Sequence, residues 1–361
     1  MNEELRQRLG SLWIMGIMGR SNEEKLAATR EALDLAQASG DLDAIFDAKL
    51  YHAGSTIVAG YADQAMPLFA WCLAHFEQDP QRFQRERDSL LRQFKRTLQK
   101  ADEFPQLSLE QIEGMRTQMG EMLRQGGYSL RTLYYTKMTF GMAIGDRAAA
   151  ADAYERYADL APDDMGDCAT CELNNELDYL IFQGDFEQAL QVGGPILRGE
   201  QTCAQVPHYT FGYVLRPLAL LGSHNEADDY QSRGYELIRS STGFLSALPH
   251  HLAYLSHRGQ YDAALQIFEN HLPEALDSRQ LRGKHHFYLA TQLMLTRLAE
   301  ERPTVTFRPP QHFPLYQPSG EYAVADLIAW LESETAPLAE QFNQRNGNQY
   351  FTHELVDRLN Y

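Results

Sequence analysis

A glycine followed five residues later by an alanine recurs along this chain at nearly constant spacing. Four such pairs follow one another in the middle of the sequence: Gly145/Ala150, Gly184/Ala189, Gly222/Ala227 and Gly259/Ala264. Their glycines are 39, 38 and 37 residues apart, and the earlier pair Gly60/Ala65 has the same internal spacing. A period of roughly 34 to 47 residues with helical patterning inside it is typical of helix-turn-helix solenoids. The sequence therefore predicts an all-α fold that grows by stacking helix pairs.

Each repeat needs these two residue types for a physical reason. Glycine permits the tight turn between two antiparallel helices, because it adopts left-handed backbone angles without a steric penalty. Alanine lets the second helix approach the first closely, whereas a larger side chain would overpack the pair. An aromatic residue four positions after the alanine, such as Tyr154 or Phe268, would lie on the same face and fill the gap to the next repeat.

Composition along the chain predicts four consecutive segments. Residues 1–80 would form N-terminal helices and a first repeat, and residues 81–130 a long helical insertion. Residues 131–300 would hold the regular repeats, and residues 301–361 a proline-rich connector followed by capping helices. Ser21 and Gly40 are expected to begin and end one N-terminal helix. Near the C-terminus we expect two helices, at about 323–333 and 336–346.

The segment from Gly145 to Pro162 resembles the second half of a tetratricopeptide repeat (TPR). In that family a small residue, an aromatic residue and a closing proline fall at these offsets, matched here by Ala150, Tyr154 and Pro162. The stretch GQYDAALQIF at 259–268 matches nearly as well. The chain departs from the family pattern in its longer units and in the large first-helix residues Met138, Leu177, Leu215 and Leu252. The resemblance implies a right-handed α-solenoid over about residues 40 to 300 that binds a peptide or partner protein in its concave groove.

The charge of the chain limits the classes of partner. Forty-nine acidic residues against 32 basic ones give a formal charge of −17. This weighs against nucleic acid and anionic membranes, which both require a basic surface. The apolar run from Leu12 to Met18 is far short of the roughly 20 residues that span a bilayer, and we expect a cytoplasmic location. A basic protein partner is compatible with the charge.

Three cysteines and one histidine form the most specific local pattern. Cys168 and Cys171 stand in a CxxC, and Cys203 follows about one repeat later, five residues before His208. Equivalent points on adjacent repeats are neighbours in space, because packed helix axes lie only about 8 to 10 Å apart. Three thiolates and an imidazole are a common tetrahedral zinc ligand set. We therefore predict a structural zinc site at Cys168, Cys171, Cys203 and His208.

Other interpretations of these cysteines stay open at this point. A CxxC at a helix start can act as a redox pair, because the helix dipole lowers the thiol pKa. A cysteine can also be a small apolar core residue, which is the interpretation we favour for Cys72. Asp167 or a water could replace His208 as the fourth ligand. The CxxC and the later Thr202-Cys203-Ala204 also resemble an element of uncharacterised bacterial repeat proteins, which supports treating the cysteines as one unit.

The remaining polar residues indicate no catalytic centre. The sequence has no phosphate-binding loop, no dinucleotide-binding glycine motif after a strand and no GxSxG. His250, His251 and His257 lack the spacing of a helical metal pair, and we expect them, like His285 and His286, to line a groove or lie on the surface. Three functions remain: a non-catalytic scaffold for a protein or peptide, an immunity or antitoxin-like protein that binds a basic toxin, and a thiol- or metal-dependent enzyme. The first accounts best for the repeats.

Overall fold

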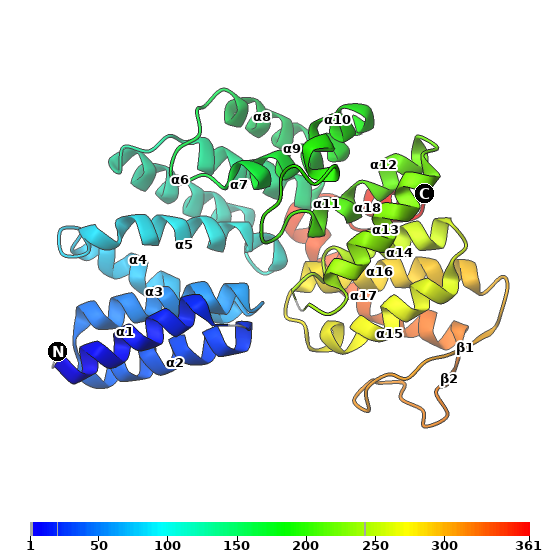
Figure 1. Cartoon of the computed structure of the whole chain (residues 1–361), viewed down its shortest axis with the longest axis horizontal. Coiled ribbons are helices and arrows are strands. Elements are labelled where there is room, and N and C mark those ends of the chain that lie inside the picture. Colours follow the sequence, from blue (N-terminus) through cyan, green and yellow to red (C-terminus); the bar gives the residue numbers. More distant parts are fainter. Residues whose placement is uncertain (1–2, 20, 242) are drawn as a thin grey trace. The chain divides into compact units, whose positions relative to one another are not determined.

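A computed structural model describes residues 3–19, 21–241 and 243–361 of the chain. Helices form almost all of its regular structure (Figure 1). In chain order the first half comprises α1 (Glu3–Met18), α2 (Asn22–Ser39), α3 (Leu42–Val58), α4 (Ala62–Gln78), α5 (Arg87–Gln99), α6 (Leu109–Gln125), α7 (Arg131–Ile144) and α8 (Arg147–Ala158), with 3-10 turns at Gln84–Glu86 and Ala101–Glu103.

The second half continues with helix pairs and ends in a mixed segment. Its elements are α9 (Ala169–Gln183), α10 (Phe186–Leu197), α11 (His208–Tyr213), α12 (Leu215–Leu220), α13 (His224–Ile238), α14 (Leu248–His257), α15 (Tyr261–Asp277), α16 (Leu281–Leu298), β1 (Thr304–Thr306), β2 (Glu321–Ala323), α17 (Val324–Asn346) and α18 (Glu354–Leu359). Consecutive helices pack on one another, as in α1 with α2, α3 with α4, and α9 with α10. The predicted all-α, repeat-like fold is confirmed.

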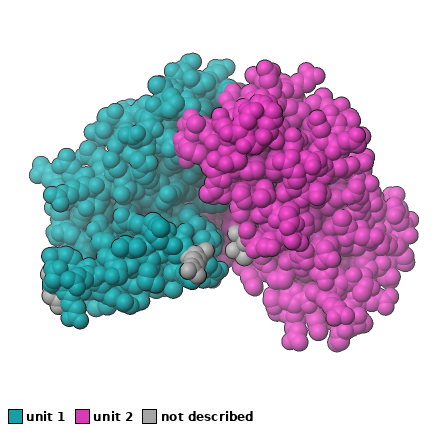
Figure 2. All heavy atoms as spheres, in the orientation of Figure 1, with its two compact units in different colours: residues 1–102, 109–140, 152–166 teal, residues 103–108, 141–151, 167–361 magenta. Residues whose placement is uncertain are grey.

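The chain forms two compact units that interleave along the sequence (Figure 2). The first comprises residues 1–102, 109–140 and 152–166, and the second comprises residues 103–108, 141–151 and 167–361. In the first unit, α1, α2 and α3 lie side by side (Figure 1) around buried leucines and alanines such as Leu9, Leu12 and Ala32. In the second, a larger core extends from α13 to the C-terminal helix.

The glycines and alanines of the repeat lie where the physical argument requires them. The glycines that end the first helix of each pair all adopt left-handed angles, with φ between 66° and 91°: Gly60, Gly145, Gly184, Gly222 and Gly259. The matching alanines are all fully buried: Ala65, Ala150, Ala189, Ala227 and Ala264. In the pair α7–α8, a methyl group at Gly141 would lie only 2.9 Å from the backbone nitrogen of Ala150. The two helices are therefore packed backbone to backbone at this point.

Local capping sets the ends of the N-terminal helices. Ser21 caps α2, and its hydroxyl accepts a hydrogen bond from the Glu24 backbone N–H over 3.2 Å. Gly40 ends the same helix with φ of 70°. Both positions agree with the sequence prediction.

The C-terminal region differs from the prediction. One continuous helix, α17, replaces the two expected helices and contains Pro337 in its interior. A proline there removes one backbone hydrogen bond, and the packing of α17 along α16 offsets that loss. The proline-rich segment before it is anchored by Phe307 and Phe313, which are 3% and 2% exposed. It also forms the short antiparallel pair of β1 with β2.

The segment after α17 packs against the α7–α8 turn of the same unit. The Asn348 side chain donates a hydrogen bond to the Ile144 carbonyl over 2.8 Å. The Tyr350 ring lies so close to Gly145 that a side chain at this glycine would clash with it. Gly145 is therefore fixed both by its left-handed backbone and by this contact.

His251 and His285 are buried, so the expectation that they lie on the surface or in a groove is wrong for these two, whereas His250, His257 and His286 are half-buried. His251 is 0% exposed and His285 is 1% exposed. The His251 ring lies against Gly234, which leaves room for it because glycine has no side chain. Burial lowers the pKa of His251 to about 3 and that of His285 to about 4. Burial also lowers the pKa of His250 to about 4, helped by Arg216 and Arg358.

We predict that Ala264→Leu destabilises the protein much more than Ala263→Leu. The two alanines are neighbours on α15, but Ala264 is fully buried and Ala263 is exposed. Overpacking at Ala264 should lower the free energy of unfolding by about 1–3 kcal/mol. Urea denaturation followed by circular dichroism measures both variants. Equal stability of the two would show that close helix approach at the alanine is unimportant.

We also predict that stability falls as the pH drops from 6.5 towards 4. The folded state keeps these histidines neutral, while the unfolded chain protonates them near their ordinary pKa of 6.5. For each histidine that only the unfolded state protonates, the free energy of unfolding falls by about 1.4 kcal/mol for every pH unit of acidification. Asp47 and Asp178 oppose this trend, because burial raises the pKa of each to about 6 and the folded state therefore binds their protons first, but the histidines outnumber them.

Thermal unfolding between pH 7.5 and 4.5 checks this pH dependence. A His251→Gln variant should show a shallower fall in Tm over that range than the parent protein. A Tm that is flat or rises on acidification would contradict the prediction.

Candidate metal centre

The start of α9 positions two of the three clustered cysteines. Cys168 is the N-cap residue of this helix, with extended backbone angles, and its sulfur accepts a hydrogen bond from the Cys171 backbone N–H at 3.4 Å. Cys171 follows in the first turn of the helix. The CxxC therefore presents two sulfurs at the start of one helix.

The third cysteine lies in the loop between α10 and α11. The backbone N–H of Cys203 donates to the Val206 carbonyl over 2.9 Å and closes a tight turn. Burial opposes ionisation of the Cys203 thiol, but the backbone N–H groups of Gln205 and Val206 and the neighbouring thiols donate to its sulfur and lower its pKa. Backbone donors aimed at a sulfur are the kind of outer-shell support that metal-bound thiolates receive.

The structure brings all three cysteines together. Their sulfurs lie within 4.8 Å of one another, and those of Cys171 and Cys203 are 3.3 Å apart. A tetrahedral zinc site with 2.3 Å metal–sulfur bonds has sulfurs about 3.8 Å apart. Cys168 is exposed and the other two are half-buried, so the cluster is open to solvent on one side. These three residues are close enough to bind one metal ion.

The thiol of Cys171 resists ionisation when no cation is bound. Burial raises the pKa of the Cys171 thiol above its usual range, and hydrogen bonds from this thiol to the sulfurs of Cys203 and Cys168 add to the effect. A bound cation reverses this balance, because it stabilises all three thiolates at once. The arrangement is therefore chemically suited to metal coordination.

The structure does not place His208 with these cysteines. Its ring stacks on Phe244, with centroids 5.2 Å apart and planes 15° from parallel. It is not among the residues whose ligand atoms lie within 4.8 Å of one another, and burial lowers its pKa. Asp167, the other candidate from sequence, also lies outside that group. The fourth position of a tetrahedral site is thus left to a water or an external ligand.

Cys72 lies apart from this cluster. It is 0% exposed, and its thiol faces the Phe46 carbonyl at 3.7 Å. Burial raises the pKa of this thiol to about 12. It is a core residue, as the sequence suggested.

No protein-family model matches this chain, and no curated protein has a sequence similar to it. Within residues 3–19, 21–241 and 243–361, no helix combines the length and the apolar character needed to cross a bilayer.

We predict that the purified protein binds one divalent metal ion per chain and that Cys168→Ser/Cys171→Ser abolishes this binding. Serine keeps the size of the side chain but removes the soft thiolate ligand. Inductively coupled plasma mass spectrometry measures the metal content. Cys72→Ala is the matched control, because it removes a thiol outside the cluster and should keep the metal. Unchanged metal content in the double variant would refute the site.

Proposed function

We propose that this chain is a non-catalytic scaffold that binds a protein or peptide partner through its helical repeats, with a structural zinc ion at Cys168, Cys171 and Cys203. The observation that carries the proposal is the position of the sulfur cluster. It joins the loop that starts α9 to the loop that starts α11, and these loops precede consecutive units of the repeat. A metal at this point would fasten one repeat junction to the next.

Zinc is the metal that best fits this ligand set. Soft thiolates select zinc or copper(I), and a structural zinc site uses its ligands to lock loops that lack a core of their own. The loop at residues 198–207 has few apolar side chains, and Val206 is its buried one. A cross-link through Cys203 would restrict this loop more than its own packing does.

The charge of the chain supports a basic partner. A formal charge of −17 attracts cationic surfaces over a Debye length of about 8 Å at physiological salt. This feature is compatible with an adaptor for a basic peptide and with an immunity-type protein that neutralises a basic toxin. Both are non-catalytic binding functions, and the identity of the partner separates them.

A thiol redox function is the second candidate, and the Cys171–Cys203 sulfur distance of 3.3 Å favours it. Two thiols at this distance can be oxidised to a disulfide with little movement. Zinc binding and disulfide formation exclude one another at these sulfurs. The state of the thiols in protein from native cells therefore distinguishes the two functions.

We expect a tagged form of the chain, purified from its native cells, to retain one partner at stoichiometric level. Mass spectrometry of the retained proteins at low and moderate salt identifies this partner, and an electrostatic interaction should weaken as salt rises. The same preparation should contain zinc, and chelation should lower its Tm. The proposal fails if no partner is retained at either salt and Cys171 and Cys203 are isolated as a disulfide.

A further inference from the structure

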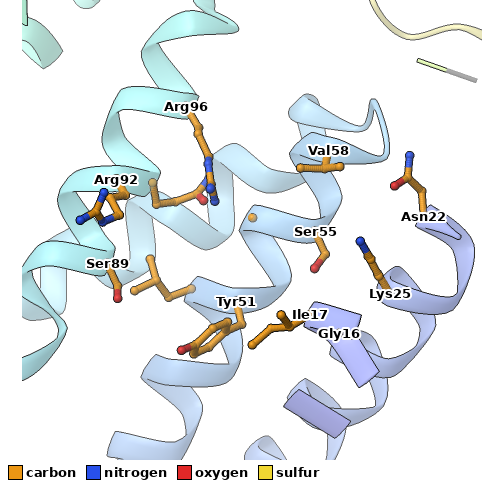
Figure 3. Close-up of a pocket in the computed structure, with 13 residues that line it drawn as sticks. Gly16, Ile17, Asn22, Lys25, Tyr51, Ser55, Val58, Ser89, Arg92 and Arg96 are labelled. Atoms are coloured by element: carbon orange, nitrogen blue, oxygen red, sulfur yellow. The ribbon is translucent and has the colours of Figure 1, made fainter. Parts of the chain in front are cut away.

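A cavity in the first compact unit has the chemistry of a ligand site. It has a volume of about 330 Å³ and lies among α1, α2, α3 and α5 (Figure 3). This volume falls at the lower end of the range of small-molecule sites, roughly 300 to 1,000 Å³. The zinc proposal and the partner proposal use none of its residues.

All the charged side chains among the described residues of its lining are basic. They are Lys25 on α2 and Arg92 and Arg96 on α5. Lys25 and Arg96 reach toward the cavity from opposite sides (Figure 3). Three basic side chains at one small cavity are unexpected in this chain, because its sequence has more acidic residues (49) than basic ones (32).

These cations are not neutralised by the described part of the chain. None of the three side chains forms an ion pair or a hydrogen bond there. Asp88, one turn before Arg92 on α5, is hydrogen-bonded to the Tyr128 hydroxyl instead. A ligand anion would therefore meet positive groups that no described side chain of the protein pairs with.

A buried amide provides an independent sign of a missing ligand. Gln93 lines the cavity and is 2% exposed, yet its side-chain Nε2 has no hydrogen-bond partner. Leaving a buried donor unsatisfied costs about 1–3 kcal/mol. Gln93 Oε1 is the amide atom that lies towards Gly54, so an acceptor atom on a ligand in the cavity would satisfy Nε2 after a flip of the amide.

The helix opposite Gln93 leaves room for such a ligand. Gly54 lies inside α3, where alanine would favour the helix by about 1 kcal/mol. A methyl group at this position would lie 3.2 Å from Gln93 Oε1 and 3.6 Å from Arg96 Nη1. The glycine thus keeps open the space beside the amide and the guanidinium.

The remaining lining combines polar side chains, at Asn22, Ser55 and Ser89, with large apolar ones, three of which are exposed. Ile17 is 61% exposed, Val58 is 55% exposed and Tyr51 is 44% exposed. Large apolar side chains grouped around a cationic cavity suit a ligand with both an anionic end and an apolar body. We propose that this cavity binds a small organic anion, with a carboxylate or phosphate head held by Lys25, Arg92, Arg96 and Gln93 and an apolar body against Ile17, Tyr51 and Val58.

Isothermal titration calorimetry of the full-length protein tests this proposal with defined probes. Octanoate and octyl phosphate carry the two candidate head groups on one apolar chain. Octyltrimethylammonium has the same chain with the opposite charge, and inorganic phosphate has the head group without the chain. We expect one molecule of an octyl anion to bind per chain. Whichever of octanoate and octyl phosphate has the lower Kd carries the preferred head group. Equal binding of the octyl cation, tighter binding of inorganic phosphate, or no binding of either octyl anion would overturn the proposal.

Three variants locate the binding. Arg96→Gln and Lys25→Gln should each weaken the preferred octyl anion at least about tenfold, as expected for loss of a charge-assisted hydrogen bond. Arg85→Gln removes an exposed arginine outside the cavity and should change the affinity by less than about twofold. An equal loss in all three variants would show that only the general charge of the surface matters.

A fourth variant separates ligand binding from folding. Gln93→Met replaces the unpartnered amide with an apolar side chain of similar size. Because no hydrogen bond is lost in the free protein, its Tm should not fall. Its affinity for the octyl anion should fall several-fold. A lower Tm with unchanged affinity would assign Gln93 to folding and remove it from the site.

Discussion

The fold depends on close contact between the two helices of each repeat. A helix can approach another at backbone distance only where the facing side chains are small. Ala150 meets Gly141 in this way, and the equivalent alanines are all fully buried. The turn that precedes each alanine must reverse the chain within a few residues, which left-handed glycines such as Gly145 make possible. These two requirements produce the spacing that is visible in the sequence.

Regular stacking also explains why distant cysteines meet. Cys168 and Cys203 stand 35 residues apart, close to one repeat, and each lies before the first helix of its pair. A repeat places such equivalent loops side by side. The sulfur cluster is therefore a consequence of the repeat, and it needs only the N-cap of α9 and the turn at Cys203 to orient its sulfurs.

The features that the sequence predicted correctly depend on interactions between residues close to one another in the chain. The features that it missed depend on tertiary packing. Capping by Ser21 and termination at Gly40 involve neighbours in the chain, so these ends could be predicted. The continuity of α17 through Pro337 and the burial of His251 depend on packing partners far away in sequence. His208 illustrates the same limit, because its stacking on Phe244 has no sequence signal.

The cavity of the first unit could not have been found from sequence for a further reason. Ser89, Arg92, Gln93 and Arg96 recur at three- and four-residue intervals on α5, which is the pattern of an ordinary solvated helix face. This face of α5 differs from an ordinary solvated face in the residues that lie opposite it. Gly54 on α3 leaves space where a side chain would otherwise lie, and Lys25 on α2 adds a third cation. Net charge describes the whole chain, whereas recognition is decided within a few ångströms. A protein with a charge of −17 can therefore present a cationic site for a small anion while its acidic surface favours a basic partner.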